Sequence, residues 1–155
     1  MDQLFKFIID SRKAFIQTID QLAVEQLNEI PNGFNNNIIW NFGHIVVSTQ
    51  TLSYVRTGIL PDTSSVRFVE GYAKGTKPTY FVEQEEVNEL KALAIQTVED
   101  IQNDYKQGRF ADIKPYSTST FSATLTSFQD VLATSAGHDN LHFGYALAQR
   151  RIINS

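Results

Sequence analysis

The chain contains three histidines, and their spacing indicates metal binding. His138 and His142 are four residues apart, so on a helix their rings lie on one face, one turn apart. A helix uses this spacing to bind a metal ion through two imidazoles. His44 lies in another segment with helical periodicity, at the edge of its apolar face. A single histidine on such a helix is more often a core residue, but all three together are candidate ligands of one divalent ion.

Three imidazoles would leave the ion with at least one open coordination position, which is typical of catalytic sites. Imidazole suits Zn²⁺, Ni²⁺, Cu²⁺ or Fe²⁺. Because the ligands are neutral, the open position favours an anion such as hydroxide, carboxylate or thiolate. The ion would acidify a bound water or thiol. The chain has no cysteine, so a thiolate–metal site and a cysteine nucleophile are both excluded.

Three other sites fit the sequence less well. A zincin protease carries H-E-x-x-H, whereas His138 is followed by Asp139 and no further ligand follows His142. A di-iron bundle needs E-x-x-H on two helices, and only residues 139–142 resemble that motif. Bis-histidine haem ligation would leave the third histidine without a role. A single-ion site is therefore the preferred interpretation.

Four segments have the helical periodicity that a bundle requires. The predicted helices lie before the turn at 31–33, from the asparagines at 35–37 to Gly58, from about 83 to 108, and from about Ser119 to the C-terminus. Residues 59–82 form a long loop between the second and third helices, with a short helical turn between Val66 and Ala73. No run alternates long enough to predict a strand. The sequence predicts one all-α domain over residues 1–155, a four-helix bundle.

Two details of these helices are further predictions. Arg12 interrupts the apolar stripe of the first helix, and its charged end is expected to point outward. Phe121 and Leu125 are expected to begin the apolar stripe of the last helix.

Composition limits the class of protein further. A chain of 155 residues with 42% hydrophobic and 19% charged residues is typical of a folded globular domain. The net charge of −4 and the lack of a basic face argue against nucleic-acid binding. No stretch approaches the roughly 18 apolar residues of a membrane helix, and the N-terminus lacks the apolar core of a signal peptide. We therefore expect a cytoplasmic protein without membrane contacts.

Five further residues are candidates for the pocket or for contacts to the ligands. Asn41 and Asp139 could orient ligands, but both could be exposed helix residues, and for Asp139 exposure is preferred. Trp40 could wall the pocket, although a core position is preferred. Tyr145 and Gln149 continue the histidine side of the last helix and could reach a ligand. Weaker candidates for contacts to an anionic substrate lie on the long loop: Tyr72, Lys74 and Lys77.

Three stretches together resemble the DinB-like (damage-inducible) superfamily. They are NNIIWNFGHIV at 36–46, FVEGYAKGTKP at 68–78, and GHDNLHFGY at 137–145, followed by Arg150-Arg151. The resemblance extends over almost the whole chain. It implies a four-helix bundle with one histidine on the second helix and an H-x₃-H pair on the last. These bind a divalent metal ion, often zinc or nickel, and the matching positions are His44, His138 and His142.

Characterised members of that superfamily include bacillithiol S-transferases and a mycothiol-dependent maleylpyruvate isomerase. The resemblance therefore implies a small-molecule substrate, a low-molecular-weight thiol as co-substrate, and a homodimer. The expected function is a divalent-metal-dependent enzyme that transfers or adds such a thiol as a metal-bound thiolate. Hydrolysis by hydroxide is a variant of this function. The alternative is a small-molecule-binding or structural protein of the same fold, stapled by the metal and without turnover.

Overall fold

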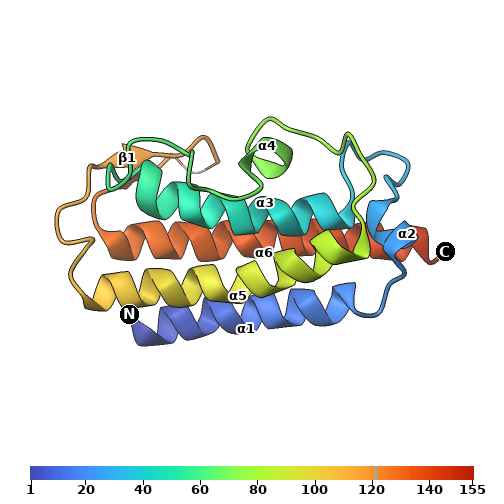
Figure 1. Cartoon of the computed structure of the whole chain (residues 1–155), viewed down its shortest axis with the longest axis horizontal. Helices are drawn as coiled ribbons and strands as arrows, with labels where there is room; N and C mark the ends of the chain where they lie inside the picture. Colours follow the sequence, from blue (N-terminus) through green and yellow to red (C-terminus); the bar gives the residue numbers. More distant parts are fainter. Residues whose placement is uncertain (121) are drawn as a thin grey trace.

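Four long helices run side by side along the molecule (Figure 1). The computed structural model describes all residues except 121. The long helices are α1 (Asp2–Ile19), α3 (Ile38–Gln50), α5 (Gln84–Lys106) and α6 (Phe128–Ile153). Both α3 and α1 pack against α5 and α6. The all-α bundle predicted from the sequence is confirmed. None of the described helices is long and apolar enough to cross a membrane.

Shorter elements connect the long helices. The first predicted helix is divided, because α1 ends at Ile19 and the short helix α2 (Val24–Asn28) follows it. Asn37 begins α3 as predicted, since its side-chain oxygen accepts the Trp40 backbone N–H at 2.9 Å. A π-helical turn, η1 (Thr51–Val55), extends α3. The predicted turn in the long loop is the helix α4 (Val69–Tyr72), which packs on α3 on the side away from α1 (Figure 1).

The last helix begins later than predicted, at Phe128 rather than near Ser119. Ser127 caps it. The Ser127 hydroxyl accepts the Asp130 backbone N–H at 3.2 Å, and the Asp130 carboxylate accepts the Ser127 N–H at 2.9 Å. This capping box satisfies two backbone donors that an earlier start would leave to other partners. The local chemistry at the cap therefore outweighs the apolar spacing that precedes it.

The segment before α6 forms a two-stranded antiparallel sheet, which the sequence did not predict. Its strands are β1 (Tyr116–Ser117) and β2 (Thr124–Leu125), with Tyr116 opposite Leu125. Leu125 is buried as predicted, but it lies on a strand of this sheet and not on a helix. Phe121, assigned to the helical stripe by the sequence, lies outside the described residues.

Two hydrophobic clusters fill the bundle, and a buried polar layer lies between them. One cluster includes Phe15, Phe42 and Leu90, and the other includes Phe5 and Val98. On α1, α5 and α6, a polar residue lies between the parts that contribute to the two clusters, and on α3 a polar residue follows the part that contributes to the first cluster. These residues are Arg12, Thr49, Thr97 and Asp139, and we call them the polar layer.

Arg12 is the centre of the polar layer and is fully buried. Its Nε donates to the Asp139 carboxylate at 2.9 Å, and its Nη2 donates to the Thr49 hydroxyl at 2.5 Å. The prediction that Arg12 points outward was wrong. Its position in the apolar stripe aims the side chain inward, and buried partners on the other helices satisfy its charge.

Candidate metal centre

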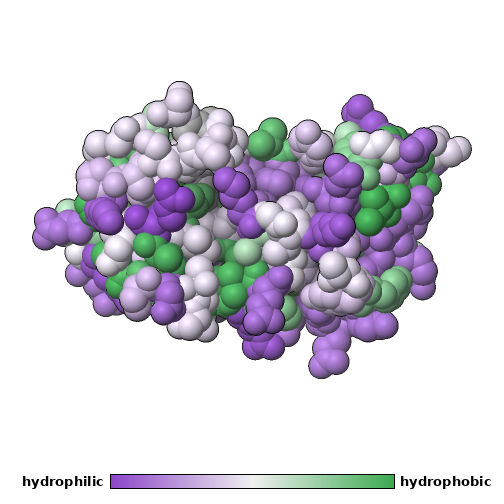
Figure 2. Space-filling view, turned by 90° about the horizontal axis from the view of Figure 1, so that it is seen from above, coloured by the Kyte–Doolittle hydropathy of each residue, from purple (hydrophilic) through white to green (hydrophobic). Residues whose placement is uncertain are grey.

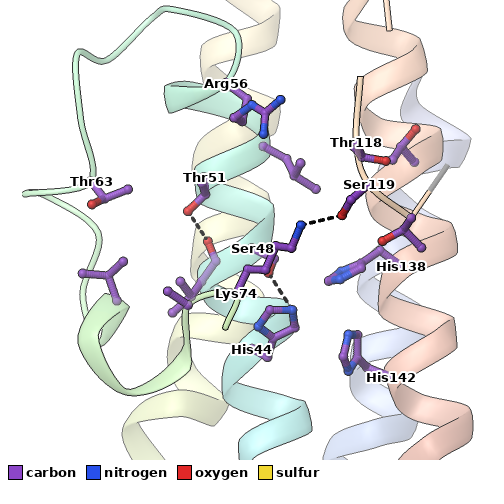
Figure 3. A pocket seen from close by; sticks show the side chains of 16 residues that line it. His44, Ser48, Thr51, Arg56, Thr63, Lys74, Thr118, Ser119, His138 and His142 are labelled. Carbon is purple, nitrogen blue, oxygen red and sulfur yellow. Dashed lines mark hydrogen bonds between the residues drawn. The ribbon is translucent and has the colours of Figure 1, made fainter. Parts of the chain in front are cut away.

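His44 of α3 meets His138 and His142 of α6 on one side of the bundle. The ring centroid of His44 lies 5.1 Å from that of His138 and 4.6 Å from that of His142. The His138 and His142 centroids are 4.6 Å apart. One ring nitrogen of each residue lies within 4.8 Å of the other two, and Figure 3 shows the rings facing one another. The three histidines therefore form one group, which could hold a metal ion.

Hydrogen bonds fix the protonation of two of the rings. His44 Nδ1 lies 2.7 Å from the Tyr72 backbone oxygen, and His142 Nδ1 lies 2.8 Å from the Asn41 side-chain oxygen. Because these oxygens only accept, each Nδ1 carries the proton and each Nε2 keeps a lone pair for a metal ion. His138 Nδ1 is buried and has no hydrogen-bond partner in the part of the chain that the structure describes. The donor set thus fits a divalent ion.

Burial also keeps the imidazoles neutral. It lowers the pKa of His44 and of His138 from 6.5 to about 4, and that of His142 to about 3. The positive charge of Arg12 further lowers the pKa of His138, and the other two rings further lower the pKa of His142. Neutral imidazole is the form that binds metals. The site is therefore ready to bind an ion at neutral pH without losing protons first.

A buried amide network holds His142 in place. Asn41 donates from Nδ2 to the Gln149 side-chain oxygen at 3.1 Å, and Gln149 donates to the Asn36 backbone oxygen at 2.7 Å. Asn41 and Gln149 are both fully buried. Asn41 thus orients the histidine of the other helix and not His44 on its own helix. Gln149 acts through Asn41, because its side chain is taken up by this network.

The other three candidates divide between site, core and surface. Trp40 belongs to a hydrophobic cluster and also stacks on His44, with ring centroids 4.7 Å apart and planes 10° apart. Its preferred core position is therefore confirmed. It contacts a candidate ligand, but it lies outside the residues that line the cavity beside the histidines. Asp139 is buried against Arg12, so the preferred exposed position was wrong. Tyr145 is 51% exposed and packs edge-on against Phe34, outside the residues that line the cavity beside the histidines.

Gly43 and Tyr72 support the site in a way that the sequence did not clearly signal. Tyr72 was a candidate only for contact to an anionic substrate, but its hydroxyl donates to Glu86 and it lies outside the cavity lining. A Cβ on Gly43 would lie 2.3 Å from Cδ1 of Tyr72, so only glycine lets the Tyr72 ring cross α3 at this point. The close packing places the Tyr72 backbone oxygen against His44. A glycine inside a helix is a readable sign of close approach, but a backbone oxygen from a distant loop is not.

A cavity of about 400 Å³ opens beside the three histidines. Its wall is formed by α3, η1, the long loop, residues 118–120 and α6 (Figure 3). Two cations line it, Arg56 and Lys74. Its apolar side chains include Val47, Leu52 and Val69. Its hydroxyl side chains are Ser48, Thr51, Thr63, Thr118, Ser119, Thr120 and Thr134. Lys77 lies outside this lining. Figure 2 views the loop side, where hydrophilic and hydrophobic residues are mixed.

The bundle and the histidine group define a helical protein with a candidate metal centre. The model of the DinB superfamily matches residues 8–146, a range that contains His44, His138 and His142. The chain belongs to the DinB superfamily. A comparison with curated proteins gives no match.

Proposed function

We propose that the protein is a divalent-metal-dependent enzyme that transfers or adds a low-molecular-weight thiol to a small-molecule substrate. The observation that carries the proposal is the group of three neutral histidines beside an open cavity of about 400 Å³. Zinc or nickel bound by His44, His138 and His142 would supply Lewis acidity, which lowers the pKa of a coordinating thiol or water.

The protein's own residues orient the ligands and admit the reactants. The Tyr72 carbonyl and the Asn41 side chain hold the protons on Nδ1 of two rings, which directs Nε2 toward the shared centre. Among the described residues that line the cavity there is neither a carboxylate nor a thiol. The proposal therefore takes its nucleophile from a co-substrate, and this fits a thiol brought in through the cavity.

The open side of the histidine group favours catalysis over a structural staple. Structural zinc sites are closed by four protein ligands, whereas catalytic sites use three and keep one position open. Within the described residues, no aspartate or glutamate joins the three histidines in one group. The cavity also lies within the size range of small-molecule sites, about 300–1,000 Å³. Both observations support an enzyme that admits a substrate.

Metal content is the first test. Elemental analysis of the tag-free protein should find about one divalent ion per chain, and His142→Ala should lose it. Asn140→Ala is the matched control, because Asn140 is exposed on the same helix and bonds to Ser11. Unaltered protein that takes up neither zinc nor nickel on reconstitution would overturn the proposal.

Thiol chemistry is the second test. In cobalt-substituted protein, a coordinating thiol should produce a sulfur-to-cobalt charge-transfer band, and mass spectrometry should detect thioether products from a panel of electrophiles. Metal binding without a thiol response would favour the structural alternative. Hydrolysis of esters or amides without thiol transfer would favour the hydrolytic variant.

A further inference from the structure

The cavity beside the histidines is positively charged. Arg56 and Lys74 line it, and none of its described lining residues is acidic. The whole chain has the opposite balance, with 17 acidic and 13 basic residues. A divalent ion on three neutral imidazoles would add further positive charge. The cavity therefore concentrates positive charge in a protein whose net charge is negative, and it would attract anions.

In the part of the chain that the structure describes, neither cation is neutralised by a carboxylate. Arg56 Nη2 donates to the Ser117 backbone oxygen at 2.8 Å, and the guanidinium lies 4.9 Å from the Tyr116 ring centroid. Lys74 Nζ donates to the Ser119 hydroxyl at 2.5 Å. Across the described residues, neither side chain forms an ion pair. These contacts orient the two cations and leave their charge available to a ligand.

The two cations lie at different depths in the cavity. In Figure 3, Arg56 lies at the end away from the histidines, with Lys74 and Ser119 between. Arg56 follows His44 by twelve residues along α3 and η1, which is roughly 18 Å of helix axis at about 1.5 Å per residue. Even with the reach of the arginine side chain, a ligand that contacts both ends must be elongated.

The wall between the two ends is partly apolar. Val47 and Leu52 line the cavity between His44 and Arg56 along α3 and η1. Val69 adds apolar surface from the long loop. Such a wall favours a hydrocarbon or thioether segment over a uniformly charged one.

We propose that the cavity binds an elongated organic anion whose anionic end lies between Lys74 and Arg56. The apolar middle of this ligand lies beside Val47 and Leu52, and its other end reaches the histidines. Guanidinium and ammonium groups bind carboxylates through charge-assisted hydrogen bonds. This inference rests on the proposed function, because the probes below bind at the histidine end through a thiol.

Three thiols of equal chain length test the inference. Their affinities for the zinc-loaded full chain are measured by isothermal titration calorimetry. Mercaptohexanoate should bind roughly fivefold to tenfold more tightly than mercaptohexanol, and aminohexanethiol should bind most weakly. The advantage of the acid should shrink at high salt, because screening weakens exposed charge pairs. This comparison uses unaltered protein and does not depend on how a variant folds.

Variants then locate the anion-binding end. Arg56→Gln and Lys74→Gln should each reduce the ratio of acid to alcohol affinity, because a carboxylate loses more than a hydroxyl when the cation is removed. Lys77→Gln is the matched control, since Lys77 is on the same loop but does not line the cavity. It should keep the full ratio.

The outcomes separate the two proposals. Equal binding of the acid and the alcohol overturns the anion-binding end and leaves thiol binding intact. An unchanged ratio in both cavity variants also overturns it, because the preference would then come from other residues. If none of the three thiols binds the zinc-loaded protein, the proposed function fails and the inference falls with it.

Discussion

The protein holds positive charge in two different ways on two sides of α3. In the polar layer, Arg12 is fully buried, pairs with Asp139, and donates to the Ala94 backbone oxygen at 2.8 Å. In the cavity, Arg56 and Lys74 are exposed, and within the described residues neither pairs with a carboxylate. The same kind of side chain is thus closed off in one region and open in the other.

The difference assigns separate tasks to the two regions. Arg12 on α1 donates hydrogen bonds to residues on α3, α5 and α6. It therefore links all four long helices, including α3 and α6, which carry the histidines. A buried charge that has all its partners can bind nothing else, and losing a partner is costly. The cavity cations have the reverse properties. We therefore expect changes in the polar layer to affect stability, and changes in the cavity to affect ligand binding.

The largest expected effect comes from Arg12→Met. The variant leaves the buried Asp139 carboxylate without its partner, and breaking such a pair costs about 3–5 kcal/mol. Urea denaturation of the metal-free protein measures this loss. Adding Asp139→Leu should recover most of it, because an apolar pair of similar volume needs no counter-charge. Lys6→Gln is the surface control, since the Lys6–Asp10 pair is exposed and should contribute little.

A loss below about 1 kcal/mol in Arg12→Met would break the comparison. The buried arginine would then be no more important for stability than a surface cation, and the hydrophobic clusters alone would hold the four helices together.

The next effect compares two glycines inside helices. Gly43→Ala should destabilise the protein by about 1–3 kcal/mol, because its Cβ would lie 2.3 Å from the Tyr72 ring. Gly144→Ala meets no atom within 4 Å and should stabilise α6 by about 0.5–1 kcal/mol, since alanine favours a helix. Denaturation curves give both values, and chelator competition should show weaker metal binding only for Gly43→Ala. Similar results for both variants would mean that Tyr72 packing does not support the site.

The features that the sequence predicted are those encoded locally. The histidine pair on α6 follows from a spacing of four residues, and Asn37 follows from the chemistry of a helix cap. The start of α6 was also encoded locally, in Ser127-x-x-Asp130, but apolar residues upstream suggested an earlier start. That error came from ranking apolar spacing above a capping box.

The features that were missed depend on contacts between distant segments. Arg12 was known to interrupt an apolar stripe, but the sequence does not show which residue on another helix could pair with it. The Tyr72 oxygen at His44 is a backbone atom, so no residue type announces it. Arg56 lines the cavity because loops that are distant in the sequence form the wall opposite it. Sequence patterns place side chains on helix faces, whereas packing between elements decides their partners.

The stability of the metal-free protein should also depend on pH, because burial lowers the pKa of all three imidazoles in the folded state. The folded pKa values of about 4 for His44 and His138, and about 3 for His142, lie below the ordinary 6.5. As pH falls below 6.5, the unfolded chain therefore takes up protons before the folded chain does. The contribution of these residues to stability should be complete above that pH and should be lost progressively down to about pH 3–4.

NMR titration of the imidazole resonances measures these pKa values directly. A variant with all three histidines replaced by glutamine should lack this part of the pH dependence, while the part due to carboxylates remains. Imidazoles that titrate near 6.5 would show that the histidine end of the cavity is as open to water as the end with Arg56, and the lowered pKa values would then be wrong.

The smallest effect concerns Ser48, which lines the cavity next to His44. Its hydroxyl is 3.2 Å from His44 Nε2 (Figure 3), and since His44 Nδ1 donates to Tyr72, this hydroxyl donates to Nε2. A metal ion needs the same lone pair, so Ser48→Ala should raise metal affinity by about twofold to fivefold. Chelator competition measures the change, with Thr51→Val as a control for loss of another cavity hydroxyl. If Ser48→Ala instead lowers metal affinity, the hydroxyl helps to hold the ion, and the cavity wall then takes part in metal binding as well as in ligand binding.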